Sequence, residues 1–189
     1  MSMDFGKPKR LKRDGTALVV VDFQERMMPA MREGASAVAE AAKLVKGFEA
    51  LGCPVLVTQQ YTKGLGESVR EIREACSSFV YTEKDTFSAM GEQNFIDAVK
   101  QVGRNTIVIC GIETHVCVLQ TALDLHEAGY TVFIAVDAIS SRKEYDKKIA
   151  VKRMVQAGIT PTTVESILFE LLENDAKSDT FKAISKIIK

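Results

Sequence analysis

Two hydrophobic patterns alternate along the chain. Short apolar runs rich in β-branched residues predict strands, at residues 16–24, 54–60, 78–84, 105–112, 130–138 and 161–164. Longer stretches, in which apolar residues recur every three or four positions, predict helices at residues 35–51, 67–75, 94–102, 114–128, 144–157, 166–172 and 178–188. The order strand, helix, strand therefore repeats from one end of the chain to the other.

Several of the expected strands are apolar at consecutive positions rather than at every second one. A strand with this pattern is buried on both faces, as in a parallel sheet whose two sides are covered by helices. The pattern predicts an α/β fold, a three-layer α/β/α Rossmann-like sandwich around a central, mostly parallel sheet of about six strands. In such sheets, ligands bind beyond the carboxyl ends of the strands.

Length and composition favour one globular domain over residues 1–189. The chain has 46% hydrophobic and 26% charged residues, and its 25 Lys and Arg balance its 25 Asp and Glu. A chain without net charge has no overall field that attracts nucleic acid or an anionic membrane, so we expect neither partner. A basic cluster lies in residues 1–15, at Lys7, Lys9, Arg10, Lys12 and Arg13. We interpret residues 1–15 as a solvated arm rather than a localisation signal.

The sequence shows no secretory signal or membrane-spanning run, so we expect a cytoplasmic protein. Its four cysteines, Cys53, Cys76, Cys110 and Cys117, have no short paired spacing. This pattern favours free thiols over disulfides or a zinc site. Cys53 and Cys110 have the surroundings of packing residues, and Cys76 those of a structural or exposed one.

Cys117 has a different setting, because it follows a buried strand that breaks at Gly111. If Thr114 is the N-cap of the next helix, Cys117 is the third helical residue. Unpaired backbone N–H groups and the helix dipole favour an anion there, so we expect the pKa of the thiol to be lowered. The alternative is a small buried hydrophobic residue, as most free cysteines are.

Two further residues with suitable chemistry lie at the same predicted edge of the sheet. Asp22 ends the first expected strand, and Lys84 ends the third, beside Glu83 and Asp85. A carboxylate can accept a thiol proton, a lysine ammonium can stabilise a thiolate, and cysteine can attack a carbonyl carbon. Asp22 alone could cap a turn and Lys84 alone could be one exposed lysine among many, but their combination with Cys117 favours a catalytic site.

The motifs VVVDFQ, the lysine after the third strand and GIETHVCV together resemble the isochorismatase-like cysteine hydrolase superfamily, over about residues 16–172. The superfamily includes nicotinamidases and N-carbamoylsarcosine amidases. The resemblance implies that Asp22, Lys84 and Cys117 are the catalytic triad. It also implies a cis peptide between Ile112 and Glu113 that shapes an oxyanion hole, with backbone N–H groups of Glu113 and Cys117 as donors.

The departures from the family pattern limit the range of activities. Nicotinamidases hold a metal with histidines after the second strand, whereas this chain has no histidine between Thr58 and Lys84. We therefore expect neither a metal nor another cofactor. Isochorismatases proper resemble the fold but do not use the cysteine, so Cys117 favours acyl chemistry on a small amide-like substrate through a thioester. The segment TQQYTKGLG looks closest to isochorismatase-domain-containing proteins, whose substrates the resemblance does not settle.

Five residues on the same rim are candidates for binding the small-molecule substrate, namely Phe23, Gln24, Gln60, Tyr61 and His115. Core packing is an equally good interpretation for Phe23 and Tyr61. Family members commonly form dimers or tetramers, so we expect a homo-oligomer. A different hypothesis is a catalytically silent or redox-responsive scaffold that uses the pocket to bind a partner, because accessible cysteines of low pKa are readily oxidised. A thiol sensor does not require Asp22 and Lys84, and their presence favours the hydrolase.

Overall fold

A single six-stranded parallel sheet forms the centre of the computed structural model, which describes residues 10–173 and 178–189. The strand order is β3-β2-β1-β4-β5-β6. The strands are β1 (Thr16–Val21), β2 (Val55–Gln60), β3 (Tyr81–Lys84), β4 (Thr106–Ile112), β5 (Thr131–Ser140) and β6 (Thr160–Thr162). This architecture confirms the predicted α/β fold.

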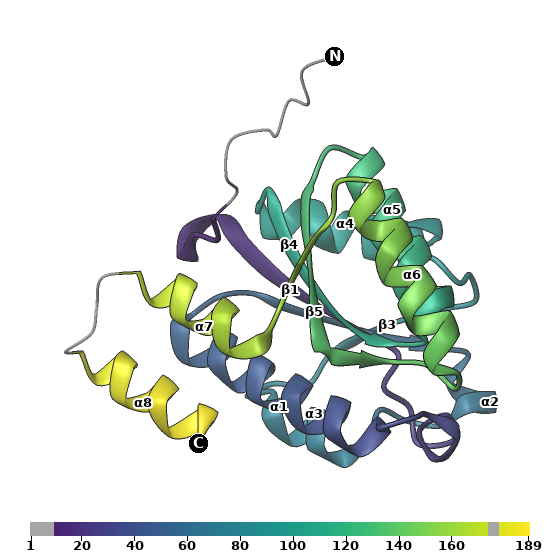
Figure 1. Ribbon diagram of the computed structural model, residues 1–189, viewed down its shortest axis with the longest axis horizontal. Coiled ribbons are helices and arrows are strands. Elements are labelled where there is room, and N and C mark those ends of the chain that lie inside the picture. Colours follow the sequence, from purple (N-terminus) through teal and green to yellow (C-terminus); the bar gives the residue numbers. More distant parts are fainter. Residues whose placement is uncertain (1–9, 174–177) are drawn as a thin grey trace.

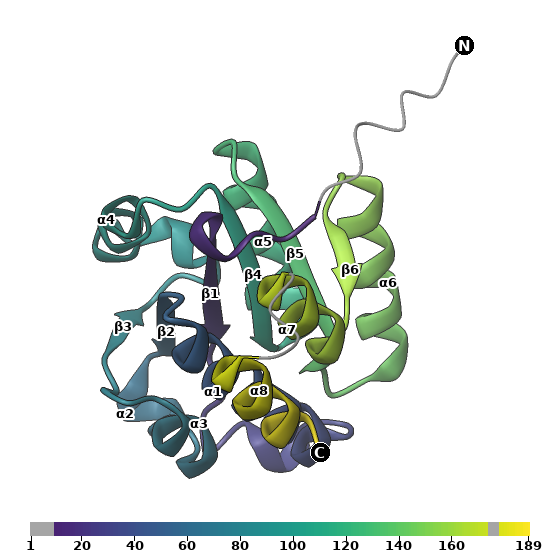
Figure 2. The ribbon, with the colours of Figure 1, turned by 90° about the vertical axis from the view of Figure 1, so that its left-hand side faces the viewer.

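Helices cover both faces of the sheet, as Figure 1 and Figure 2 show. One face carries α1 (Gly34–Leu51), α3 (Arg70–Ala75), α7 (Val164–Leu172) and α8 (Asp179–Ile188). The other face carries α4 (Gln93–Val102), α5 (Leu119–Glu127) and α6 (Glu144–Gln156). Successive residues of β1 alternate between two core clusters, since Leu18 and Val20 pack under the first group while Ala17, Val19 and Val21 pack under the second.

Several boundaries differ from those expected. Strand β1 ends at Val21, three residues early, because Asp22 turns the chain with a φ of 51°. Strand β2 begins at Val55, after Pro54, which has no N–H to donate. A short helix that the sequence analysis missed, α2 (Thr62–Leu65), precedes α3, which begins three residues later than expected.

The largest correction to the expected helices concerns residues 114–128. They are not one α-helix: a π-helical turn, η4 (Thr114–Val118), comes first, and α5 begins only at Leu119. Single π-turns of this kind occur frequently at functional sites. The turn lies directly after β4, and it carries Cys117.

The expected solvated arm is also partly wrong. Residues 1–9 lie outside the described part of the chain, but Leu11 is buried in the core beneath α7. Its backbone N–H donates to a carboxylate oxygen of Glu170, at 2.9 Å. The side chain of Arg13 donates to the carbonyl of Leu51, at 2.6 Å. Residues 10–15 therefore attach to the body of the protein.

Candidate active site

Asp22 follows β1 at the carboxyl edge of the sheet, with its side chain completely buried. Its backbone N–H donates to the carbonyl of Thr58 on β2, at 3.2 Å, and its Oδ1 accepts from the Thr58 hydroxyl, at 2.7 Å. Among the described residues, no donor forms a hydrogen bond of regular geometry with Oδ2. Thr58 therefore fixes the carboxylate through one oxygen and leaves the other for a different contact.

Lys84, the last residue of β3, supplies the charge beside that second oxygen. Its Nζ lies 2.8 Å from Asp22 Oδ2, and both side chains are fully buried. The same Nζ donates to three other acceptors, the side-chain oxygen of Gln60 at 2.6 Å and the carbonyls of Thr86 and Phe87, each at 3.0 Å. An ammonium has three N–H groups. All three therefore have acceptors, and the contact of Nζ with Asp22 Oδ2 is that of an ion pair.

Cys117 completes the group from the π-turn η4. It is 5% exposed, and it lies close enough to Asp22 and Lys84 for both to change the pKa of its thiol through charge and hydrogen bonding. The preceding Ile112–Glu113 peptide bond is cis, at the position that the family resemblance implied. The expected N-cap is wrong, however, because Glu113 caps the turn with extended backbone angles and the Thr114 hydroxyl donates to the carbonyl of Ser140 instead.

The pKa of Cys117 departs from its ordinary value in the direction opposite to that expected. Burial is the main cause, followed by the charge of Asp22, and together they raise the pKa of the thiol to about 12 although Lys84 lowers it. The N-terminal end of a helix favours a thiolate only through the neighbouring chain. Removal of the thiol from water and a carboxylate from another strand oppose the thiolate more than one lysine supports it.

We predict that alkylation of Cys117 by iodoacetamide requires alkaline pH in the folded protein. Its titration midpoint should lie above the ordinary thiol value of 9.0, because the folded state favours the protonated form. Asp22→Asn should move the midpoint to lower pH by removing a negative charge, whereas Lys84→Gln should move it to higher pH. Mass spectrometry of the Cys117 peptide over a pH series measures the midpoint.

The same peptide in concentrated urea provides the control, since an unfolded thiol has neither the burial nor the neighbours. A folded protein whose Cys117 is alkylated with a midpoint below that of the urea sample would contradict the effect of burial and Asp22. An unchanged midpoint in Asp22→Asn would contradict the contact with Asp22.

Glu113 has a structural contact that the sequence did not indicate. Its carboxylate is largely buried and accepts from the backbone N–H of Arg142, at 3.0 Å, and from the Arg142 side chain, at 3.1 Å. Arg142 follows β5. The pair therefore ties the start of the Cys117 turn to the segment after the neighbouring strand.

The structure separates the five candidate substrate residues. Gln60 lies at the site, because it accepts from Lys84, whereas the amide of the buried Gln24 is occupied by the backbone of Gln60 and Gly66. Phe23 is 1% exposed in the core cluster under α1, on the face of the sheet opposite Cys117. Gln24 and Phe23 thus have structural contacts within the fold, and their contact with substrate stays a prediction.

The side chains of Tyr61 and His115 have neighbours outside the buried group. Tyr61 is half exposed, and its ring covers Gly64 in α2. The His115 ring is 3.0 Å from the Ser141 hydroxyl, and its other nitrogen is 3.9 Å from Asp146 on α6. His115 therefore faces the α6 side of the turn, with neighbours separate from Asp22 and Lys84.

Two contacts that the sequence analysis missed support Lys84 from α5. The loop after β3 supplies the carbonyls of Thr86 and Phe87, and it is attached to the helix that follows Cys117. Ser88 donates to Asp124, at 2.6 Å, and the Ala89 N–H donates to the hydroxyl of Thr121, at 3.0 Å. No sequence spacing indicates these contacts, because each joins residues more than 30 positions apart.

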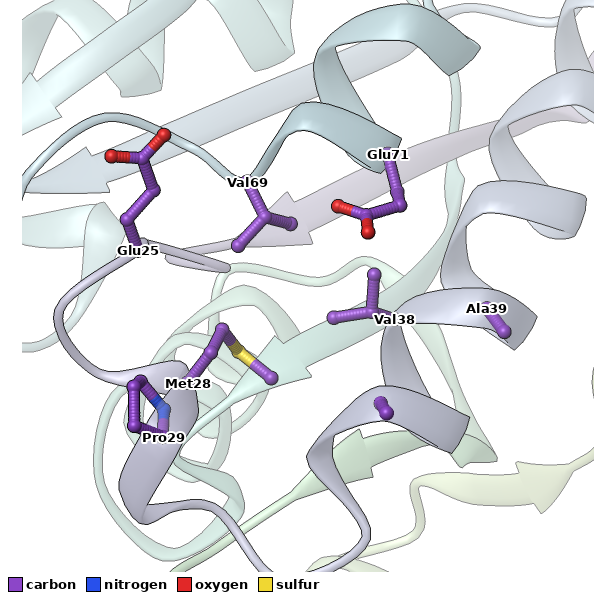
Figure 3. Close-up of a pocket in the computed structure, with 8 residues that line it drawn as sticks. Glu25, Met28, Pro29, Val38, Ala39, Val69 and Glu71 are labelled. Carbon is purple, nitrogen blue, oxygen red and sulfur yellow. The ribbon is translucent and has the colours of Figure 1, made fainter.

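A groove of about 440 Å³ lies elsewhere on the molecule, as Figure 3 shows. Met28, Val38 and Val69 form an apolar floor, and the carboxylates of Glu25 and Glu71 lie at its rim. These apolar residues belong to or pack against the core cluster under α1, whereas Cys117 belongs to the cluster on the opposite face. The apolar lining of this groove therefore lies on the face of the sheet opposite Cys117.

Three further features of the described residues concern the cysteines, metal binding and the membrane. All four cysteines are free thiols, as predicted, and burial raises the pKa of Cys53, Cys76 and Cys110. No group of three or more His, Cys, Asp or Glu within residues 10–173 and 178–189 could hold a metal ion. None of the described helices has the length and apolar character needed to cross a membrane.

Comparisons with known proteins identify the family. The isochorismatase domain model matches residues 16–166. Isochorismatase domain-containing protein 1 from Salmo salar is 38% identical over 174 residues, which cover 92% of this chain and 61% of that protein. The chain thus spans less than two thirds of this relative's length.

Two solved structures share the fold over nearly the whole chain. The MAR1 ribonuclease from Caenorhabditis elegans is 34% identical, with a TM-score of 0.89, over 95% of this chain and 92% of that one. The YcaC gene product from Escherichia coli, described as an octameric hydrolase of unknown specificity, is 26% identical, with a TM-score of 0.90, over 97% of this chain and 91% of that one. The matched motifs, the parallel sheet and these relatives lead to one conclusion: the chain belongs to the isochorismatase domain family of hydrolase-like proteins.

Proposed function

We propose that this protein is a cysteine-dependent hydrolase of a small amide-like substrate, with Cys117 as nucleophile, Asp22 as base and acid, and Lys84 as the stabilising charge. The observation that carries the proposal is the fully buried ion pair of Asp22 and Lys84, with the Cys117 thiol close enough to Asp22 for a side-chain hydrogen bond. The thiol proton can therefore pass to the carboxylate.

The raised pKa of Cys117 defines the first step. At neutral pH the resting thiol is protonated, so Asp22 accepts its proton as the sulfur attacks the carbonyl carbon of the substrate. The ammonium of Lys84 stabilises the carboxylate before the transfer and the developing negative charge during it. Backbone N–H groups of Glu113 and Cys117 are the donors for the oxyanion, and each such donor is typically worth about 3 kcal/mol.

The second half of the reaction restores the enzyme. When the tetrahedral intermediate collapses, the C–N bond breaks and Asp22 returns its proton to the leaving amine. A water molecule then attacks the thioester carbon, and Asp22 accepts a proton from that water. The C–S bond breaks, the carboxylic acid leaves, and the proton returns to the sulfur of Cys117.

Burial of the three residues limits the size of the substrate. Asp22 and Lys84 have no exposed side-chain surface, and Cys117 is 5% exposed. Such burial favours a small substrate over a polynucleotide, although one relative is named a ribonuclease. Balanced charges also provide no overall attraction for RNA. These features support small amides and ureides as the proposed substrates.

The same features disfavour the redox-responsive scaffold. Oxidation to sulfenic acid follows thiolate character and exposure, and Cys117 has little of either in the resting protein. We include self-assembly in the proposal, as a homo-oligomer, because the YcaC product of the same fold is described as octameric.

The test of the hydrolase proposal combines turnover with trapping. We expect wild-type protein to hydrolyse members of a panel of small amides and ureides, and small aldehydes to add reversibly to Cys117, as shown by native mass spectrometry of the intact protein. Cys117→Ala should lose both activities. Asp22→Asn should lower hydrolysis by about 10²–10⁴-fold, the usual contribution of a positioned acid or base.

Cys76→Ala serves as the matched control, because Cys76 is a partly exposed thiol outside the group. It should retain full hydrolysis and aldehyde addition. Hydrolysis that survives Cys117→Ala would overturn the mechanism, as would a wild-type protein that neither hydrolyses the panel nor adds any aldehyde at Cys117. Cleavage of an RNA oligonucleotide that depends on Cys117 would overturn the choice of substrate class.

A further inference from the structure

The outer side of α6 exposes large apolar side chains beside the Cys117 turn. Tyr145 is 73% exposed and Ile149 is 38% exposed, one helical turn apart. They border a surface groove of about 230 Å³ between α6 and the turn, together with His115 and Leu119. Exposed apolar surface next to a groove is typical of a contact with another protein.

Charges on this side of α6 are arranged antisymmetrically about Ile149. Asp146 lies three residues before Ile149, and Arg153 lies four residues after it. At 100° per residue, both side chains point to the same side of Ile149, by about 60° and 40°. Tyr145 and Lys152 point to the other side by about 40° and 60°. Among the residues within this arc around Ile149, an acidic group thus precedes Ile149 and basic groups follow it.

The ion pairs that Glu144 forms do not involve Asp146, Lys152 or Arg153, so these charged residues are available for contact with a partner. Glu144, at the start of α6, is engaged by Arg32 and Lys148. The Asp146 carboxylate lies 3.9 Å from Nε2 of the His115 ring. Within the described residues, neither Lys152 nor Arg153 forms an ion pair. A partner that covers the groove would therefore find a weakly paired acid and two unpaired bases around an apolar centre.

A second copy of this chain has the complementary arrangement. If two α6 helices pack antiparallel about a two-fold axis, Ile149 contacts Ile149 of the partner subunit, and Asp146 lies beside Arg153 of the partner subunit. Tyr145 then lies beside Lys152 of the partner subunit, in reach of a cation–π contact. The two-fold axis repeats each pair, as an isologous interface requires.

We propose that α6 forms a two-fold interface between copies of this protein, centred on Ile149 and bordered by the Asp146–Arg153 pairs. The inference rests on the homo-oligomeric state included in the proposed function. It places the interface beside η4, on the opposite side of the turn from Asp22 and Lys84. A contact there also covers the groove next to His115.

Charge reversal with compensation tests the interface. In sedimentation velocity experiments, Arg153→Glu should raise the dissociation constant at least tenfold, because it places two acids at each pair. Asp146→Lys should do the same with two bases. The double variant, with the charges exchanged, should restore assembly to near the wild-type value. Ile149→Asp should at least halve the number of copies in the assembly.

Val80→Asp is the matched control, because Val80 is also 73% exposed but precedes β3, away from α6. It should assemble as the wild type does. In addition, Ile149→Cys should form an intermolecular disulfide on mild oxidation, since the two-fold axis brings the residue against its own copy. Val80→Cys should not form one.

Three results would overturn the inference. A wild-type protein that is monomeric at every concentration would also remove the homo-oligomer from the proposed function. Assembly that persists in Ile149→Asp, or single charge reversals that the double variant does not rescue, would reject this surface while leaving self-assembly intact. None of these experiments measures hydrolysis. Failure of the hydrolase proposal would therefore be seen only in the hydrolysis assays, separately from failure of this interface.

Discussion

Lys84→Met should destabilise the protein by about 3–5 kcal/mol, the usual cost of removing one partner from a buried ion pair. The variant leaves the Asp22 carboxylate buried without its counter-charge. It also removes the donor from Gln60 and from the carbonyls of Thr86 and Phe87. Because a typical domain has a free energy of unfolding of about 5–15 kcal/mol, the loss is a large fraction of the total. Urea denaturation measures it.

A double-mutant cycle with Asp22→Asn isolates the contribution of the ion pair. Asp22→Asn/Lys84→Met should be more stable than Lys84→Met alone, because no unpaired charge remains, and the coupling free energy should exceed about 1 kcal/mol. Lys100→Met, an exposed lysine on α4, is the control and should change the free energy of unfolding by less than about 0.5 kcal/mol. A zero coupling energy would mean that the two charges do not stabilise each other.

Gly111→Ala should have a comparable effect, because two independent constraints apply at this residue. A Cβ at Gly111 would lie 2.3 Å from the carbonyl oxygen of Val21 and 2.6 Å from its Cβ. The φ of Gly111 is also +139°, a conformation that favours glycine. Overpacking and backbone strain each cost about 1–3 kcal/mol. Since Val21 precedes Asp22, hydrolysis should also fall where the variant remains folded.

Variants at two other glycines distinguish the cost of backbone strain from the cost of overpacking. Gly129 has a φ of +93°, but a Cβ added there would have no atom of the described residues within 4 Å, so Gly129→Ala should show the cost of backbone strain alone. Gly15 has neither constraint, and Gly15→Ala should be nearly neutral. Urea denaturation of the three variants should therefore rank them, with Gly111→Ala the least stable. Equal stability of Gly111→Ala and Gly129→Ala would show that β1 and β4 separate at little cost.

The sequence determined the fold and predicted that Asp22, Lys84 and Cys117 lie close together. Alternating apolar runs predicted the strands and helices, and consecutive burial predicted a sheet covered on both faces. Since parallel strands end at one edge, Asp22 and Lys84 had to lie near the turn that carries Cys117. The structure brings these three together for that reason.

Tertiary structure alone decided how each of these residues is surrounded. Thr58 binds Asp22 across two strands, and the carbonyls that hold Lys84 come from a loop attached to α5. Phe23 lies on the face of the sheet opposite Cys117, which its position beside Asp22 did not reveal. These partners are set by long-range packing, and local spacing in the sequence carries no record of them.

The pKa of Cys117 shows most clearly why the local sequence could not predict these surroundings. From the sequence, the start of a helix favoured the thiolate, because the nearest backbone N–H groups were the only known neighbours. In the folded protein, the loss of water and the carboxylate of Asp22 have the larger effects, and they favour the thiol. Local chain geometry is encoded by neighbouring residues, whereas desolvation and charge depend on residues that only folding brings together.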